Sequence, residues 1–298
     1  MKLPKNFPLI LLASPLIFSL ELVFLKWAFT KGGLDPINFT ANRSVFGAIF
    51  LAFFGLVPLA KEIRKDWKSV LKWVLILTAI RATGDFLYFI CQNLSTPGAF
   101  SLLLQLSVFS TGLFAFLILR ERLPPREIVG GLIMVFGALF VILSKGNGAV
   151  SVGFGEALTL AFVVLIGIGN AFSKKAIDSG IDRNAILFGA TILSVPVFYI
   201  LAPILFGKFP LSTFASDLPY AIGGALFFAA NTLVIFYCFE HFGPSRTQIA
   251  SISNVIFSAL FAFLLLGLSP SIPDIVGGAI IIGGVLVFLN AGTKRVKS

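Results

Sequence analysis

Three ionisable residues lie inside long apolar stretches, where a charge is costly and marks a candidate site: Glu21, Arg81 and Asp85. Arg81 and Asp85 are four residues apart, so on a helix they share one face and can form an ion pair. Tyr88 and Gln92 continue that face. The planar guanidinium of Arg81 suits a ligand carboxylate or phosphate, while Glu21 could bind a ligand amine or carry a proton.

Each of these charges also has a structural interpretation. Arg81 and Asp85 could tie neighbouring helices together, and Glu21 could be a partner of Arg81. If all three are ionised, they carry one positive and two negative charges, which suits a zwitterionic or cationic ligand better than a dianionic one. The sequence leaves the functional and the structural interpretation open, with Glu21 as the candidate for proton coupling.

Uncharged polar residues supply further candidate contacts with a substrate. Thr247, Ser251, Asn254 and Ser258 lie at positions i, i+4, i+7 and i+11, so they share one face of a helix. Such groups could face a cavity, bond to their own backbone or bridge two helices. The remaining polar candidates for substrate contact are Gln105, Asn170 and Asn231.

The chain offers none of the usual enzyme chemistry. It has no Walker-type phosphate loop, and its single histidine, His241, rules out a histidine-based metal site. Cys91 and Cys238 are expected near opposite membrane faces, where they neither pair nor share a zinc ion. We therefore expect no catalytic residue, no metal and no cofactor. The net charge of +10 is spread between apolar runs, which argues against a nucleic-acid partner.

The elements that must position these residues are transmembrane helices. Hydrophobic residues make up 57% of the chain and charged residues 12%, against about 25% charged in a soluble domain. Because about 20 apolar residues of helix cross a bilayer, the apolar runs predict an all-α polytopic membrane protein. Its ten predicted transmembrane helices are residues 9–29, 37–58, 71–92, 96–119, 127–144, 153–174, 184–206, 217–240, 244–266 and 271–291.

Basic residues gather in alternate connections between these spans, which predicts an orientation. With the N-terminus in the cytoplasm, most of the 23 Lys and Arg residues fall on the cytoplasmic side. The exceptions are Lys31, Arg43, Lys145 and Lys208 outside, and Lys26 and Arg81 within spans. We therefore expect both termini in the cytoplasm and the protein in the cell (inner or plasma) membrane, with lipids as partners. Monomer and homodimer both remain open.

An internal repeat relates the two halves at an offset of 147 residues. Pro97 matches Pro244, Cys91 matches Cys238, and the run 128–131 matches 275–278. The predicted domains are therefore 1–147 and 148–298, each a repeat of five helices. Because five is an odd number, the second repeat is inverted relative to the first, as in many secondary transporters.

The chain resembles the drug/metabolite transporter superfamily, and within it the EamA-type branch. The resemblance rests on the five-plus-five helices, Glu121 after span four, and Gly130-Gly131 with Gly137 in span five. It implies alternating access and a central cavity walled mainly by spans 1, 3, 4, 6, 8 and 9. The chain departs from the family pattern at Ser107 and Asn254, where a proline is often found, and at Leu268, where an acidic residue is missing.

These observations predict a secondary transporter that moves a small polar metabolite by alternating access. Amino acids or related amphiphilic compounds are the favoured substrates, and export is the favoured direction. Sugar- or nucleotide-linked metabolites are the alternative, although they should need more cationic residues than Arg81 alone. A channel, a structural membrane protein and an intramembrane enzyme are more remote alternatives, since neither a continuous polar path nor a nucleophile–base constellation is present.

Overall fold

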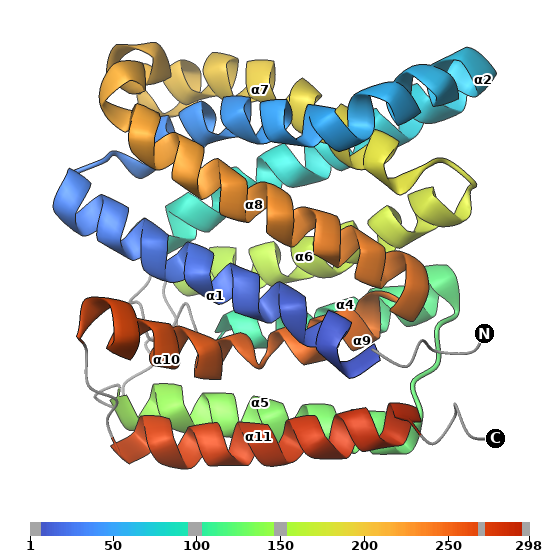
Figure 1. Cartoon of the computed structure of the whole chain (residues 1–298), viewed down its shortest axis with the longest axis vertical. Helices are drawn as coiled ribbons and strands as arrows, with labels where there is room; N and C mark the ends of the chain where they lie inside the picture. The colour runs from blue at the N-terminus through green and yellow to red at the C-terminus, as the bar shows by residue number, and fades with distance from the viewer. Residues whose placement is uncertain (1–6, 95–102, 146–153, 268–271, 294–298) are drawn as a thin grey trace.

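The computed structural model describes residues 7–94, 103–145, 154–267 and 272–293, and every regular element in these ranges is a helix. The helices lie across the long axis of the molecule in successive layers, with α7 and α2 at one end and α5 and α11 at the other (Figure 1). Their bounds are α1 (Phe7–Gly32), α2 (Pro36–Leu94), α4 (Ser107–Leu119), α5 (Pro125–Lys145), α6 (Phe154–Asp178), α7 (Arg183–Phe206), the short 3₁₀ helix η1 (Pro210–Thr213), α8 (Phe214–Phe242), α9 (Pro244–Ser251), α10 (Asn254–Leu266) and α11 (Ile272–Thr293).

The long helix α2 contains two of the predicted spans. Its backbone leaves the helical conformation at Asp66, with φ −155° and ψ 84°, so the chain turns there into a second arm. The side chain of Asp66 accepts a hydrogen bond from the backbone N–H of Ser69 at 3.2 Å, which caps the start of that arm. The two arms meet at the right-hand edge of Figure 1.

The predicted span 244–266 is broken near its middle, between α9 and α10. At the break, backbone N–H groups bond three residues back, as those of Ser253 to Ala250 and Val255 to Ile252 do, so the helix tightens without losing its hydrogen bonds. The same pattern occurs at the start of α4, where the backbone N–H of Phe109 donates to the carbonyl oxygen of Leu106. Thus helices α10 and α4 begin at Asn254 and Ser107, and the break forms without the proline that the family often has there.

The helix bounds repeat at the offset found in the sequence. Helix α4 spans 107–119 and α10 spans 254–266, which is a shift of 147 at both ends. Helices α2 and α7 begin at Pro36 and Arg183, so the same shift holds there, where the sequences match only loosely.

Glycines at the α5–α11 interface show that the two repeats are inverted. A Cβ on Gly137 would lie 3.0 Å from the carbonyl oxygen of Gly277, and a Cβ on Gly284 would lie 2.9 Å from that of Gly130. At the offset of 147 residues, Gly284 is the equivalent of Gly137 and Gly277 is the equivalent of Gly130, so the two contacts are the same contact made from opposite repeats. Such a self-matching contact between equivalent helices requires a two-fold relation with antiparallel helices, and small residues allow the close approach.

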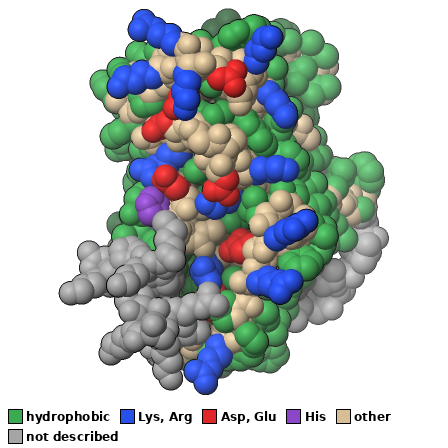
Figure 2. All heavy atoms as spheres, turned by 90° about the vertical axis from the view of Figure 1, so that its right-hand side faces the viewer, with side chains coloured by type: hydrophobic (Ala, Val, Ile, Leu, Met, Phe, Trp, Pro, Cys, Tyr) green, Lys and Arg blue, Asp and Glu red, His purple; other side chains and the backbone are tan. Residues whose placement is uncertain are grey.

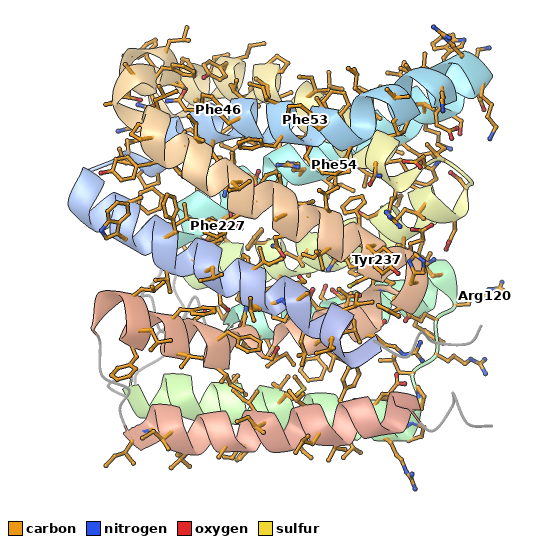
Figure 3. All side chains as sticks on the ribbon, in the orientation of Figure 1. Phe46, Phe53, Phe54, Arg120, Phe227 and Tyr237 are labelled. Carbon is orange, nitrogen blue, oxygen red and sulfur yellow. The ribbon has the colours of Figure 1, made fainter. Side chains whose placement is uncertain are left out.

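The outer surface of the helices is strongly apolar. Phe53 is 82% exposed and Phe54 56% exposed on α2 (Figure 3), which is expected of side chains that face lipid. Six helices among the described residues are long and apolar enough to cross a membrane, and one of them is α2 with both its arms. The protein is therefore a polytopic all-α membrane protein.

Charged side chains gather at one edge of the molecule. Figure 2 faces the right-hand side of Figure 1, where the bend of α2 and the connections α4–α5, α6–α7 and α8–α9 lie, and it shows many Lys and Arg side chains. Exposed basic residues of these segments include Arg64, Lys68, Arg120 and Arg122. The connections that the sequence predicts to be basic therefore lie together at this edge.

Candidate functional site

A cavity of about 300 Å³ lies among the second arm of α2 and helices α6, α7 and α8. Its lining comes from the first turns of α7 (Leu187, Ala190) and the later turns of α8 (Phe228, Thr232, Phe236). The cavity therefore extends from the middle of the bundle toward the α6–α7 and α8–α9 connections. Its lining residues do not come from α1, α4 or α9, so it is narrower than the central cavity that the family resemblance implies.

Arg81 lies on the wall of this cavity with only part of its hydrogen-bonding capacity used. One terminal nitrogen donates to Thr191 Oγ1 at 2.9 Å, and the guanidinium stacks over the ring of Phe228 at 4.4 Å. The Nε atom is buried and has no hydrogen-bond partner among the described residues, since Asp85 Oδ2 is 3.8 Å away. A buried donor without a partner beside a cavity is a favourable place for a ligand acceptor.

Asp85 faces the same cavity from the next turn of the helix. The i,i+4 relation predicted for Arg81 and Asp85 is present, but at 3.8 Å their contact is an ion pair without a hydrogen bond. The pair joins two turns of one helix, and the link from this arm to α7 is instead the hydrogen bond from Arg81 to Thr191.

Glu21 is paired with Arg43 rather than with Arg81. Arg43 donates to Glu21 Oε1 at 2.6 Å, and Glu21 is only 4% exposed. The sequence interpretation placed Arg43 outside the membrane and missed it as a member of the charged cluster. Its place in span two, seven residues after Pro36, was the available signal.

The inclusion of Arg43 changes the charge balance of the cluster. Two arginines, Arg43 and Arg81, now face two acids, Glu21 and Asp85, and both arginines lie over the ring of Phe228, at 5.1 and 4.4 Å. The excess of negative charge inferred from three residues is therefore absent. A neutral cluster favours a neutral or zwitterionic ligand over a purely cationic one.

Phe228 is a second residue that the sequence interpretation missed. It is the equivalent of Arg81 in the other repeat, at the offset of 147. Residues that are equivalent under a two-fold relation can touch only near its axis, so the contact between Arg81 and Phe228 lies close to the pseudo-two-fold axis. The repeat itself was the signal that could have identified Phe228.

Two predicted residues of the first repeat are not part of the cavity lining, although Tyr88 lies behind one of its lining residues. Tyr88 packs its ring against Phe162 at 5.9 Å, in an apolar cluster around Cys91. Gln105 lies in the short helical turn before α4 and is partly buried. Neither lines the cavity, and the side chain of Gln92 is outside the described part of the chain.

The polar residues of the second repeat divide into one that lines the cavity and three that do not. Asn170 lines it and donates to Thr111 Oγ1 at 3.1 Å and to Gln248 Oε1 at 3.2 Å, which links α6 to α4 and α9. Asn231 accepts from Ser14 at 2.9 Å, Ser251 bonds to the carbonyl of Thr247, and the Asn254 carbonyl accepts from Ser19. These last contacts are the helix-bridging and self-bonding alternatives.

A second polar group ties the two repeats together at the charged edge. Glu127, only 1% exposed, accepts from Arg246 at 2.7 Å, and Glu121 accepts from Ser245 Oγ at 3.1 Å. Burial raises the pKa of the Glu121 carboxyl above its ordinary value of 4.5, and the hydrogen bonds from Ser245 offset only part of this effect. At the opposite edge Lys208 pairs with Asp35 at 2.7 Å. Among the described residues, no group of three or more His, Cys, Asp or Glu could hold a metal ion.

The model of the EamA-like transporter family matches residues 7–143 and 153–290, once for each repeat. The chain belongs to the EamA-like transporter family. An uncharacterized transporter of Methanothermobacter thermautotrophicus is 24% identical to this EamA-like chain, over 85% of this chain and 78% of that protein. One solved crystal structure superposes with a TM-score of 0.70 at 19% identity, over 96% of this chain and 99% of that one, which supports the fold alone.

Proposed function

We propose that this EamA-like protein is a secondary transporter that moves small zwitterionic, amphiphilic metabolites, such as amino acids, across the cell membrane by alternating access. Export is the favoured direction. The observation that supports this substrate class is the unpartnered Nε atom of Arg81 on the cavity wall, one helical turn from the Asp85 carboxylate. A substrate carboxylate would bind Arg81 and its ammonium group would lie toward Asp85.

The apolar part of the substrate would contact the aromatic wall of the cavity. Phe162, Phe228 and Phe236 all line it. A volume of about 300 Å³ is at the lower end of the range for small-molecule sites. Sugar- or nucleotide-linked substrates remain the alternative, but Arg81 is the one cationic residue among those that line the cavity.

The proposed orientation follows the charge. The edge with the α2 bend and the α4–α5, α6–α7 and α8–α9 connections carries the basic residues, so it would face the cytoplasm. The described start of α1 and the described end of α11 lie toward the same edge in Figure 1, which supports a cytoplasmic location for both termini. The cavity would then lie on the cytoplasmic side of the bundle centre.

Transport in proteoliposomes tests this function. Purified protein is assayed for exchange of labelled amino acids, sugars and nucleotides, beside Arg81→Gln and the control Lys72→Gln, which removes an exposed cation from the same arm of α2. We expect saturable exchange of an amphiphilic amino acid such as leucine, abolished in Arg81→Gln and retained in Lys72→Gln. Exchange of a nucleotide or sugar instead would favour the alternative, and equal exchange by both variants would contradict the role of Arg81.

A further inference from the structure

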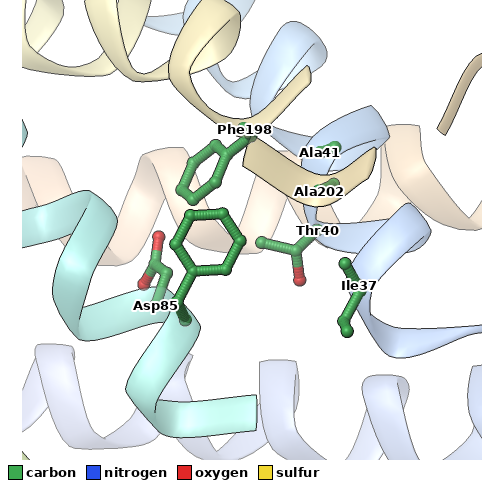
Figure 4. A pocket seen from close by; sticks show the side chains of 7 residues that line it. Ile37, Thr40, Ala41, Asp85, Phe198 and Ala202 are labelled. Carbon is green, nitrogen blue, oxygen red and sulfur yellow. The ribbon is translucent and has the colours of Figure 1, made fainter. Parts of the chain in front are cut away.

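A second, much smaller cavity lies on the other side of Asp85. Its volume is about 10 Å³, close to the minimum that holds one water molecule. Residues from the start of α2 (Ile37, Thr40) and the end of α7 (Phe198, Ala202) line it together with Asp85 (Figure 4). It therefore lies toward the end of the bundle that carries the Asp35–Lys208 pair, opposite the end toward which the large cavity extends.

Asp85 is the residue that lines both cavities. On one side it faces the proposed substrate cavity, and on the other it faces space for about one water molecule. A carboxylate in this position can exchange a proton with water on one side and interact with a ligand on the other.

The inverted repeat allows the two ends of the molecule to be compared residue by residue. At the offset of 147, three residues around the small cavity correspond to larger or less polar ones in the second repeat: Ala41 to Phe188, Thr40 to Leu187, and Asp85 to Thr232. Leu187 and Phe188 belong to a packed apolar cluster with Leu51. A Cβ on Gly55, the equivalent of Ala202, would lie only 2.3 Å from the Cβ of Phe188, so Phe188 fills the space next to Gly55, while Leu187 and Thr232 line the large cavity.

The two acids of the cluster differ in how firmly they are held. Glu21 accepts a hydrogen bond from Arg43 at 2.6 Å, whereas Asp85 is 3.8 Å from Arg81. Glu21 is buried and held by Arg43, whereas Asp85 makes no hydrogen bond to an arginine and lines both cavities. Asp85 is therefore the acid of the cluster that water and a ligand can both reach.

We propose that Asp85 is a proton-binding site that exchanges protons with the outer side of the membrane through the one-water cavity beside Thr40. The charged groups around it are Arg81 on its own arm, Arg43 on the first arm of α2 and Glu21 on α1. The residues of α6, α7 and α8 that line either cavity are uncharged. This assignment replaces Glu21 as the candidate for proton coupling.

The consequence for transport rests on the proposed function. A substrate ammonium would bind the ionised form of Asp85, and a proton would neutralise the same carboxylate. Proton and substrate would then compete for one group, so that a proton bound from the outer side favours release of the substrate. This order couples inward movement of protons to export.

Infrared difference spectroscopy tests the proton site without any substrate. Purified protein that carries Glu121→Gln, which removes a carboxyl whose raised pKa would give a second band, is stepped in nanodiscs between acidic and alkaline buffer. The C=O stretch of a protonated carboxyl within the bundle is recorded in this background for every variant. We expect a pH-dependent band in wild type and Glu21→Gln, its loss in Asp85→Asn, and its return in Asp85→Glu, which also shows that this position tolerates substitution. A band that persists in Asp85→Asn, or that disappears in Glu21→Gln, would overturn the assignment.

A kinetic experiment tests the route. Thr40 is buried and its hydroxyl bonds to the carbonyl of Pro36 four residues back, and Thr159 on α6 makes the same type of bond. We expect Thr40→Val to slow proton uptake by Asp85 several-fold after an acid step on the outer side of oriented proteoliposomes, while Thr159→Val leaves the rate unchanged. Equal rates in both variants would refute the route.

The transport assay separates this inference from the proposed function. In Asp85→Asn the substrate ammonium loses its contact, so we expect leucine exchange with a raised KM that no longer changes with pH, and no proton-driven accumulation. A raised KM that still changes with pH as in wild type would make Asp85 a substrate contact alone and overturn the proton role. If no compound is exchanged by wild type but the infrared band behaves as expected, the proton site is supported and the substrate proposal fails.

Discussion

Two adjacent glycines of α11 provide a sharp test of how the repeats are joined. A Cβ on Gly284 would lie 2.6 Å from Met134 Cγ, 2.8 Å from the Met134 backbone nitrogen and 2.9 Å from the Gly130 carbonyl oxygen. Two of these atoms belong to the backbone and cannot move away without parting the helices. A Cβ on Gly283 would meet no atom within 4 Å.

The expected magnitudes follow from these distances. In a helix, alanine is about 0.8–1.0 kcal/mol more favourable than glycine, so Gly283→Ala should stabilise the protein by about that amount. Gly284→Ala gains the same helix propensity, but its methyl group overpacks the interface, which costs about 1–3 kcal/mol. The two variants should therefore differ by about 1–3 kcal/mol, which corresponds to roughly 2–6 °C in melting temperature for a chain of this size.

Thermal unfolding of the two variants in one detergent is the assay. Gly284→Ala should melt below Gly283→Ala, and Gly137→Ala should lie between them because two of its three close contacts are side-chain atoms of Ile280 and Ile281, which can shift. Equal melting temperatures for Gly283→Ala and Gly284→Ala would refute the close α5–α11 packing, and with it the evidence for the inverted contact.

Two further predictions concern the polar group at the charged edge. The raised pKa of Glu121 means that the folded state binds this proton more tightly than the unfolded state, so stability falls as pH rises above 4.5 toward the folded-state pKa. Glu121→Gln should flatten this part of a melting-temperature–pH profile without loss of stability at neutral pH, and an unchanged slope would contradict the assignment. Arg246→Ala leaves the carboxylate of Glu127 buried and unpaired, so it should cost about 3–5 kcal/mol in chemical denaturation. Removal of the exposed Arg122 should have little effect.

The fold was predictable because a bilayer imposes simple rules on a sequence. The membrane-crossing helices and the repeat offset follow from apolar length and matched Pro and Gly positions. The polar helix between the predicted spans 37–58 and 71–92, with its bend at Asp66, was not predicted because apolar length does not report helix outside the bilayer. The helix break at Asn254 was not predictable, because the tightened turn depends on backbone bonds and on a contact from Ser19 that no local pattern encodes.

The site was less predictable, since pairs between helices are decided by tertiary packing. The i,i+4 relation of Arg81 and Asp85 was visible in the sequence, but the partner of Glu21 is set by how α1 crosses α2. Ser251 was predicted to face a cavity, yet its hydroxyl bonds to the Thr247 carbonyl one turn back. A hydroxyl on a helix can always make that bond, so its position on a polar stripe does not identify a cavity wall.

The repeat explains where in such a molecule the chemistry can lie. Two inverted halves with identical sequences would form equivalent ends. The ends can differ in charge and polarity only at positions where equivalent residues differ. Near the axis these are Arg81 against Phe228 and Asp85 against Thr232, and both pairs line the cavity. The charge of the cavity wall therefore comes from positions where the repeats differ, while glycines that they share allow α5 and α11 to pack closely.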